Sequence, residues 1–365
     1  MAKKNNNLNI KDAEYIKLAY EQALINLGST KKNPSVGCII VKNNTVISSG
    51  RTSVNGRPHA EANALKEKLN YKGSNLYVTL EPCSHYGQTP PCINKIINKK
   101  IKKVIFSVTD KDPRSKNLAY RRLKKAKIIV KKFILKKQVA LLYKSYFLQT
   151  TEQTPFIDAK LAISKDYLSI NKKKKWITNS SSRKVGNFLR SKYDCILTTS
   201  KTINFDNSQL DCRIEGLEKK SPAVIIIDRF FKIKKNLKIF KKKSRPIFIF
   251  TQTRNSLKEK FFRKNGIKII KLKKIDSTKN DVTEVYFTLK QLGFNRILIE
   301  TGMRYINEVL KHSLIKNFYL FKSPFSIKND GKNNTNLHLI RKLKIMSKNK
   351  VKINLNGDSL YKIEL

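Results

Sequence analysis

Long apolar runs and paired cysteines are missing from this sequence. No apolar stretch approaches the roughly 18 residues that a membrane-spanning helix needs, and the opening segment MAKKNNNLNI lacks the apolar core of a secretory signal. Five cysteines are an odd number for a framework of disulfides. These absences argue against a membrane or secreted protein, so we expect a protein of the reducing cytoplasm with no membrane partner.

Acidic residues are also scarce. The 365 residues include 78 Lys and Arg against 26 Asp and Glu, a formal charge of +52. Such a charge can serve nucleic-acid binding, but lysines outnumber arginines about fourfold and are scattered along the chain. The longest run, Lys172 to Lys175, holds no aromatic residue on which a base could stack. We interpret the charge as compositional bias and expect weak, salt-sensitive binding to nucleic acid, with no specific nucleic-acid partner.

The chain is long enough for two domains, each with its own core. Helical and strand patterns alternate on both sides of the polar stretch Gln149–Thr154, which precedes Pro155. This pattern predicts two α/β domains, over residues 1–150 and 155–365. Residues 155–365 contain no glycine-rich dinucleotide fingerprint, so a Rossmann domain is not indicated there.

In the first domain the patterns predict a helix over residues 12–27, with Asp12 as its N-cap and Gly28 at its end. A hairpin is expected at Asn43-Asn44. Further helices are expected over residues 59–69, from Pro91 onward and over residues 138–148, with strands at 75–80, 104–108 and 128–130. In the second domain, short apolar strands are predicted at 156–162, 195–198, 224–227, 247–250, 267–270 and 297–299.

The residues that carry chemistry are His59-Ala60-Glu61, Cys83 and Cys92. One histidine and two cysteines supply three zinc ligands and leave the fourth tetrahedral position open for water, as a catalytic site requires. Zinc lowers the pKa of its water from 15.7 to about 7. Glu61, two residues beyond a ligand, can face that water without binding the metal and can shuttle its proton.

Zinc nucleobase deaminases carry His-x-Glu together with Pro-Cys-x-x-Cys. The first half matches here, but eight residues separate Cys83 from Cys92. The alternative is a chance His-Ala-Glu beside two buried structural thiols.

Three strings, NPSVGCIIVK (33–42), PHAE (58–61) and TLEPCSHYGQTPPC (79–92), closely resemble the deaminase half of the bifunctional deaminase/reductase family of riboflavin biosynthesis. The resemblance implies a cytidine-deaminase-like three-layer sandwich, with zinc on His59, Cys83 and Cys92 and with Glu61 as proton donor. It also implies substrate contacts from Asn33 and His85. As an alternative, Asn33 before Pro34 is simply a good turn residue.

The strings PFIDAKLAIS (155–164) and Glu300-Thr301-Gly302, together with Thr202–Arg213, resemble the reductase half of the same family, which is similar to dihydrofolate reductase. The resemblance implies one Zn²⁺ per chain and NADPH as cofactors. It places NADPH contacts at Ala162, Trp176, Thr202, Asp206, Gly302 and Met303. It places substrate contacts at Lys174, Arg190, Leu210, Arg213 and Glu300.

The reaction that the resemblance implies is hydrolytic deamination of 2,5-diamino-6-ribosylamino-4(3H)-pyrimidinone 5′-phosphate, followed by reduction of the ribosyl group to a ribityl chain. Several positions depart from the family. Gln88 stands where relatives usually carry Lys or Arg, and Arg114-Ser115 replaces Asn-Pro. Tyr167 and Lys174 replace smaller residues.

Two rival functions remain open at this point. The first is a zinc deaminase that acts on RNA or free nucleosides. The second is a degenerate fusion in which only one activity survives. The sequence also leaves open whether the chain forms a homo-oligomer.

Overall fold

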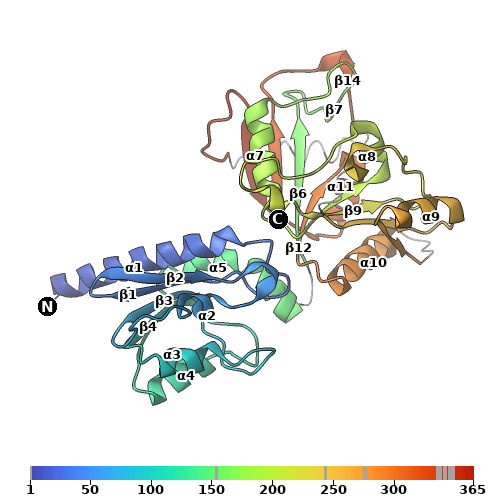
Figure 1. The fold of residues 1–365 in the computed structure, drawn as a ribbon. Helices are drawn as coiled ribbons and strands as arrows, with labels where there is room; N and C mark the ends of the chain where they lie inside the picture. The colour runs from blue at the N-terminus through green and yellow to red at the C-terminus, as the bar shows by residue number, and fades with distance from the viewer. Residues whose placement is uncertain are drawn as a thin grey trace. The chain divides into compact units, whose positions relative to one another are not determined.

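The structure is a computed structural model that describes residues 2–152, 155–241, 245–273, 278–333, 339, 343 and 350–365. The chain divides into two compact units, Met1–Gln153 and Thr154–Leu365, each with its own sheet and apolar core (Figure 1). Within the described residues, no helix combines the length and the apolar character that crossing a bilayer requires.

The first unit is built on a five-stranded sheet in the order β2-β1-β3-β4-β5. Its strands are β1 (Gly37–Lys42), β2 (Thr45–Arg51), β3 (Asn75–Leu80), β4 (Lys103–Val108) and β5 (Ile129–Lys132). The predicted hairpin joins β1 to β2, because Asn43 and Asn44 have φ values of 51° and 62°, the left-handed conformation that a tight two-residue turn requires. β3, β4 and β5 run parallel.

Helices cover both faces of this sheet, which makes the unit a three-layer sandwich (Figure 1). One layer holds α1 (Ala2–Ile25) and α5 (Lys136–Leu142), followed by α6 (Lys144–Phe147). The other holds α2 (Ala60–Ala64), α3 (Cys92–Asn98) and α4 (Leu118–Lys125). Because both faces are covered, β1, β3 and β4 are buried along almost their whole length.

The prediction that Asp12 caps a helix is wrong. α1 begins at Ala2, so Asp12 lies inside the helix. Its buried carboxylate accepts hydrogen bonds from the hydroxyl of Tyr77 and the ammonium groups of Lys103 and Lys131. Asp12 therefore ties α1 to strands β3, β4 and β5.

Three further boundaries differ from the prediction. α2 stops at Ala64, whose carbonyl accepts hydrogen bonds from the hydroxyls of Ser48 and Tyr71 instead of from a continuing helix. The helix predicted over 138–148 is divided between α5 and α6. In the predicted linker, Leu148–Glu152 forms a π-helical turn, and residues 153–154 lie outside the described residues.

The second unit has an eight-stranded sheet in the order β11-β10-β9-β8-β12-β6-β13-β15. The strands are β6 (Phe156–Ile163), β8 (Cys195–Thr199), β9 (Ala223–Ile227), β10 (Ile247–Thr251), β11 (Lys268–Lys271), β12 (Arg296–Glu300), β13 (Ile315–Lys322) and β15 (Ser359–Glu364). All neighbours pair in parallel except β13 and β15. The six apolar strands predicted in this half all form.

The helices of the second unit are α7 (Ser180–Arg190), α8 (Ser200–Asp206), α9 (Ser256–Lys264), α10 (Thr278–Gln291) and α11 (Met303–Lys311), and a small ribbon pairs β7 (Ile170–Asn171) with β14 (Gly331–Lys332). β12 lies between β8 and β6, which come earlier in the chain, so the carboxyl ends of these three parallel strands meet at one edge of the sheet. Ligands bind outside that edge in open α/β sheets.

Candidate active sites

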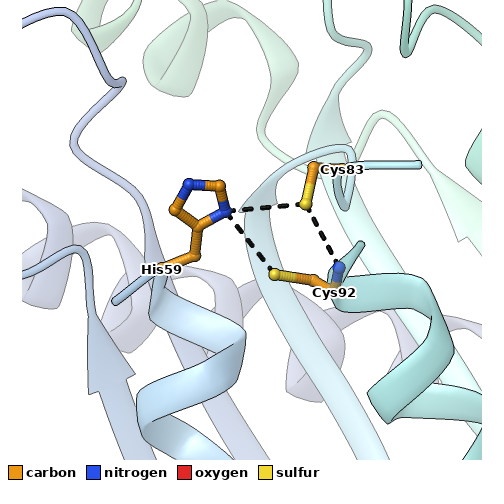
Figure 2. A group of neighbouring side chains, drawn as sticks. All are labelled: His59, Cys83 and Cys92. Atoms are coloured by element: carbon orange, nitrogen blue, oxygen red, sulfur yellow. Dashed lines mark hydrogen bonds between the residues drawn. The ribbon is translucent and has the colours of Figure 1, made fainter. Parts of the chain in front are cut away.

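The structure of the first unit brings His59, Cys83 and Cys92 together (Figure 2). His59 directly precedes α2, Cys92 is the first residue of α3, and Cys83 lies in the loop that follows β3. His59 Nδ1 lies 3.5 Å from Cys83 Sγ and 3.6 Å from Cys92 Sγ. All three potential ligand atoms lie within 4.8 Å of one another.

These separations fit a tetrahedral zinc ion. Zinc binds a cysteine sulfur at about 2.3 Å and a histidine nitrogen at about 2.0–2.1 Å, so a tetrahedral angle places N and S about 3.5–3.6 Å apart. Both measured N–S distances fall in that range. The donor set is one imidazole nitrogen and two cysteine sulfurs, and three ligands leave one tetrahedral position open.

The two cysteine thiols of the cluster differ in pKa. Hydrogen bonds from Cys92 lower the pKa of Cys83 to about 4, so its sulfur is a thiolate at neutral pH. That thiolate raises the pKa of the neighbouring buried Cys92 thiol. A hydrogen bond with Cys83 raises the pKa of His59, while burial and the positive charge of Arg57 act against it.

Glu61 lies beside the cluster without being part of the ligand triad. Its carboxyl is buried, interacts with the charge of Cys83 and shares a hydrogen bond with Cys92. Burial, followed by the Cys83 charge, raises the pKa of Glu61 to about 7. A carboxyl with such a pKa can both accept and donate a proton near neutral pH.

His85 and Asn33 are each held by one hydrogen bond. His85 Nδ1 lies 2.7 Å from the hydroxyl of buried Ser115, which leaves Nε2 for other partners. Asn33 Nδ2 donates to the carbonyl of Gly56 at 2.8 Å. The backbone N–H of Asn33 also donates to the carbonyl of Thr30, so Asn33 closes a turn while its side-chain amide is bonded to Gly56.

Ser115 is a residue that sequence reasoning missed as a functional candidate. Its loop is held at both ends by buried Glu81, whose Oε2 accepts the backbone N–H groups of Asp110 and Asn117. Nothing in the spacing of these residues shows that the loop returns to His85, because the contact spans 30 positions of the chain.

In the second unit, a cluster of threonines marks the carboxyl ends of β8 and β12. Thr202 lies 2.9 Å from Thr301 and 3.0 Å from Thr199, hydroxyl to hydroxyl. Its hydroxyl accepts the backbone N–H of Gly302 at 3.3 Å. Gly302 directly precedes α11. The free backbone N–H groups at the start of α11 and the positive end of its dipole therefore face the edge of the sheet where β8 and β12 end.

Glu300, Arg190 and Lys160 form a buried charged group beside these threonines. Arg190 donates from Nε and Nη2 to the two carboxylate oxygens of Glu300, at 2.6 and 2.9 Å, and Lys160 Nζ lies 3.5 Å from Glu300 Oε2. Burial alone would raise the pKa of Glu300, but Arg190 and Lys160 outweigh it and lower the pKa to about 2. Glu300 is therefore ionised throughout the neutral range.

Arg190 has few donors left for a substrate in this state. Its Nη1 donates to Asn187 Oδ1 and to the carbonyl of Asp211, both at 3.0 Å. Arg213, the other arginine among the predicted substrate contacts, is half exposed and pairs with Asp211 at 3.4 Å. Arg213 is thus the more available of the two guanidinium groups.

The loop that carries Leu210 is fixed by a residue outside the predicted set. Leu210 is buried with a φ of 54°, and Arg245 donates to the carbonyls of Gln209, Leu210 and Pro222. Lys160 was also missed, although a lysine inside the mostly apolar strand β6 is a visible signal.

The remaining predicted residues of the second unit differ in exposure. Trp176 is 50% exposed, with the charged groups of Lys175 and Arg183 at 5.1 and 4.9 Å from its ring. Lys174 and Asp206 are exposed, and Ala162 is half-buried near the end of β6. Met303 is 1% exposed, so only its backbone can contact a cofactor.

Each of the two units matches a known protein family. Residues 9–108 match the cytidine and deoxycytidylate deaminase zinc-binding region, and residues 155–353 match the RibD C-terminal domain. The riboflavin biosynthesis protein RibD of Buchnera aphidicola is 34% identical over 341 residues, which cover 88% of this chain and 90% of that protein. RibD of Aquifex aeolicus is 31% identical over 316 residues, which cover 86% and 87%.

A solved structure of Acinetobacter baumannii RibD has a TM-score of 0.82 at 26% identity and covers 98% of this chain and 99% of that chain. The predicted family resemblance and the predicted α/β fold of both halves are therefore confirmed. The chain belongs to the RibD family of riboflavin biosynthesis proteins and is a bifunctional enzyme that joins a zinc-dependent deaminase to an NADPH-dependent reductase.

Proposed function

We propose that His59 Nδ1 and the thiolates of Cys83 and Cys92 hold the zinc ion, and that Glu61 moves the protons of the deamination. The observation that carries this proposal is the pair of N–S distances, 3.5 and 3.6 Å, which a tetrahedral zinc site requires. The substrate is a small phosphorylated pyrimidine, which we propose to be 2,5-diamino-6-ribosylamino-4(3H)-pyrimidinone 5′-phosphate.

Zinc, when bound, lowers the pKa of water to about 7 and so supplies hydroxide at neutral pH. Glu61 takes one proton from that water and delivers it to the ring nitrogen, and then carries the second proton of the water to the departing amine, which leaves as ammonia. Because burial and the neighbouring Cys83 raise the pKa of Glu61 to about 7, both transfers lie within its reach. His85 Nε2 and the amide of Asn33 orient the pyrimidine.

In the second unit we propose that the cofactor lies across the carboxyl ends of β6, β8 and β12. Thr202, the backbone of Gly302 and Met303, and the exposed ring of Trp176 bind it, together with Ala162 and Asp206. NADPH, when bound, supplies the hydride that turns the ribosyl group into a ribityl chain. Arg213 and Arg190, which is paired with Glu300, hold the sugar phosphate of the substrate. Leu210 and Lys174 lie beside that part of the substrate.

We also propose that the enzyme works in the reducing cytoplasm, where its five free thiols are stable, and that nucleic acid is not a specific partner. The basic side chains are spread over both units and engage in scattered local contacts. A measurement of the protein's mass in solution shows whether the chain assembles with copies of itself.

The rival function, deamination of RNA or free nucleosides, is separated by a substrate panel. The zinc-loaded protein is incubated with cytidine, with transfer RNA and with the phosphorylated diaminopyrimidine, and ammonia is measured. We expect release from the diaminopyrimidine alone. Release from cytidine or transfer RNA at a comparable rate would contradict the proposed substrate.

A further inference from the structure

The phosphate of the substrate needs a cation at the deaminase site, and position 88 does not supply one. Gln88 is neutral and exposed on the loop between Cys83 and Cys92. A phosphate is held best by a guanidinium group with free N–H donors. The arginines and lysines around the zinc ligands can therefore be compared by what they already bind.

Most of these cations are occupied. Arg114 is held by Asp112, at 3.0 Å from Nε and 2.6 Å from Nη2, so its charge is already neutralised. Arg122 donates to the carbonyl of Ser84 and to Asn94 Oδ1. Lys95 donates to the carbonyl of Ala62 at 3.1 Å.

Arg57 differs from these residues. Its Nη1 donates to the hydroxyl of Thr89 at 2.6 Å, which fixes the guanidinium against the loop that carries Gln88. In the part of the chain that the structure describes, no carboxylate pairs with Arg57.

Gly87 lets Arg57 and His85 approach one another. A Cβ atom at Gly87 would lie 3.4 Å from Arg57 Nη2 and 4.0 Å from His85 Nε2. Arg57 Nη2 thus lies beside the bare backbone of Gly87, on the same loop as His85. A guanidinium beside exposed backbone is a suitable partner for a phosphate oxygen.

We propose that Arg57 binds the 5′-phosphate of the substrate at the deaminase site and so supplies the charge that Gln88 lacks. This inference rests on the proposed deaminase function. It assigns Arg57 a binding role specific to the phosphorylated form of the substrate, with no part in zinc binding or proton transfer.

The test compares Arg57→Gln with the unaltered enzyme on two substrates, the ribosylamino-pyrimidine with and without its 5′-phosphate. We expect KM for the phosphorylated form to rise about 10- to 100-fold, the range for losing a hydrogen bond to a charged group. KM for the dephosphorylated form, kcat and zinc content should change little. Arg121→Gln, at an exposed arginine of α4, is the matched control for the loss of one positive charge.

Two further variants separate binding from loop structure. Thr89→Val removes the hydrogen bond to Arg57 while keeping its charge and should weaken binding of the phosphorylated form less than Arg57→Gln does. Adding Gln88→Arg to Arg57→Gln should restore much of the lost affinity. An equal loss on both substrates, or no loss on either, would overturn the assignment of Arg57. If the unaltered enzyme released no ammonia from either substrate, the proposed function itself would fail.

Discussion

Replacing Glu61 by glutamine is expected to abolish ammonia release while leaving one zinc ion per chain. The amide keeps the size of the side chain but cannot carry the proton from water to the pyrimidine, a role worth roughly 10²- to 10⁴-fold in rate. Zinc should stay because its ligands, His59, Cys83 and Cys92, are untouched. The measurements are ammonia release and zinc content of the purified variant.

Glu67→Gln provides the matched control, since Glu67 is exposed just beyond α2. It should retain full activity. The Glu61 variant should also still oxidise NADPH when given the deaminated substrate, because that reaction belongs to the second unit. Loss of zinc from the Glu61 variant, or full ammonia release, would show that the role assigned to Glu61 is wrong.

Replacing Glu300 by alanine is expected to stop NADPH oxidation and to destabilise the second unit, while ammonia release persists. Removing one partner of a buried ion pair leaves an uncompensated charge and costs about 3–5 kcal/mol. Here two cations, Arg190 and Lys160, lose their shared carboxylate. Thermal unfolding, followed together with both activities, measures the effect.

The same group predicts a dependence on pH. The pKa of Glu300 lies at about 2 in the folded chain, below its ordinary value of 4.5. A carboxyl whose pKa is lowered on folding stabilises the protein above its unfolded pKa, and that stability disappears as the pH falls through the folded pKa. The unaltered second unit should therefore lose stability between pH 4.5 and 2, and Glu300→Ala should lose less over that range.

A double replacement distinguishes stability from binding. Arg190→Met with Glu300→Leu removes both members of the pair and should recover part of the stability, since apolar replacements of a buried pair are often neutral, whereas Lys160 still lacks its carboxylate. It should not recover reduction, because the charged pair that helps Arg213 to hold the sugar phosphate is gone. Restored NADPH oxidation in this variant would mean that the pair has a structural role only.

The cluster of His59, Cys83 and Cys92 was predictable because its signal is local. A short stretch of chain is enough to show that helix starts or prolines lie next to His59, Cys83 and Cys92. Glu61 follows His59 by two positions. Six of the eight strands of the second sheet were predictable for the same reason, but β13 and β15 were not among the predicted strands. The runs of buried, β-branched residues in the predicted strands are continuous.

The parts that were not predictable depend on contacts across the chain. From the local sequence, Asp12 looks like a helix cap. Its partners Lys103 and Lys131 lie on strands about 90 and 120 positions further along the chain. The contact between Ser115 and His85 and the anchoring of the Leu210 loop by Arg245 are likewise long-range. Composition and periodicity hold no information on which loops meet.

The most direct test of two independent sites in one chain follows ammonia and NADPH together, using the phosphorylated diaminopyrimidine as substrate. Without NADPH, the enzyme should release one ammonia per substrate and stop at the deaminated ribosyl compound. With NADPH, one NADPH should be oxidised for each ammonia released, and the product should carry a ribityl chain. NADPH oxidation before ammonia release, or the absence of either reaction from the zinc-loaded protein, would contradict the account.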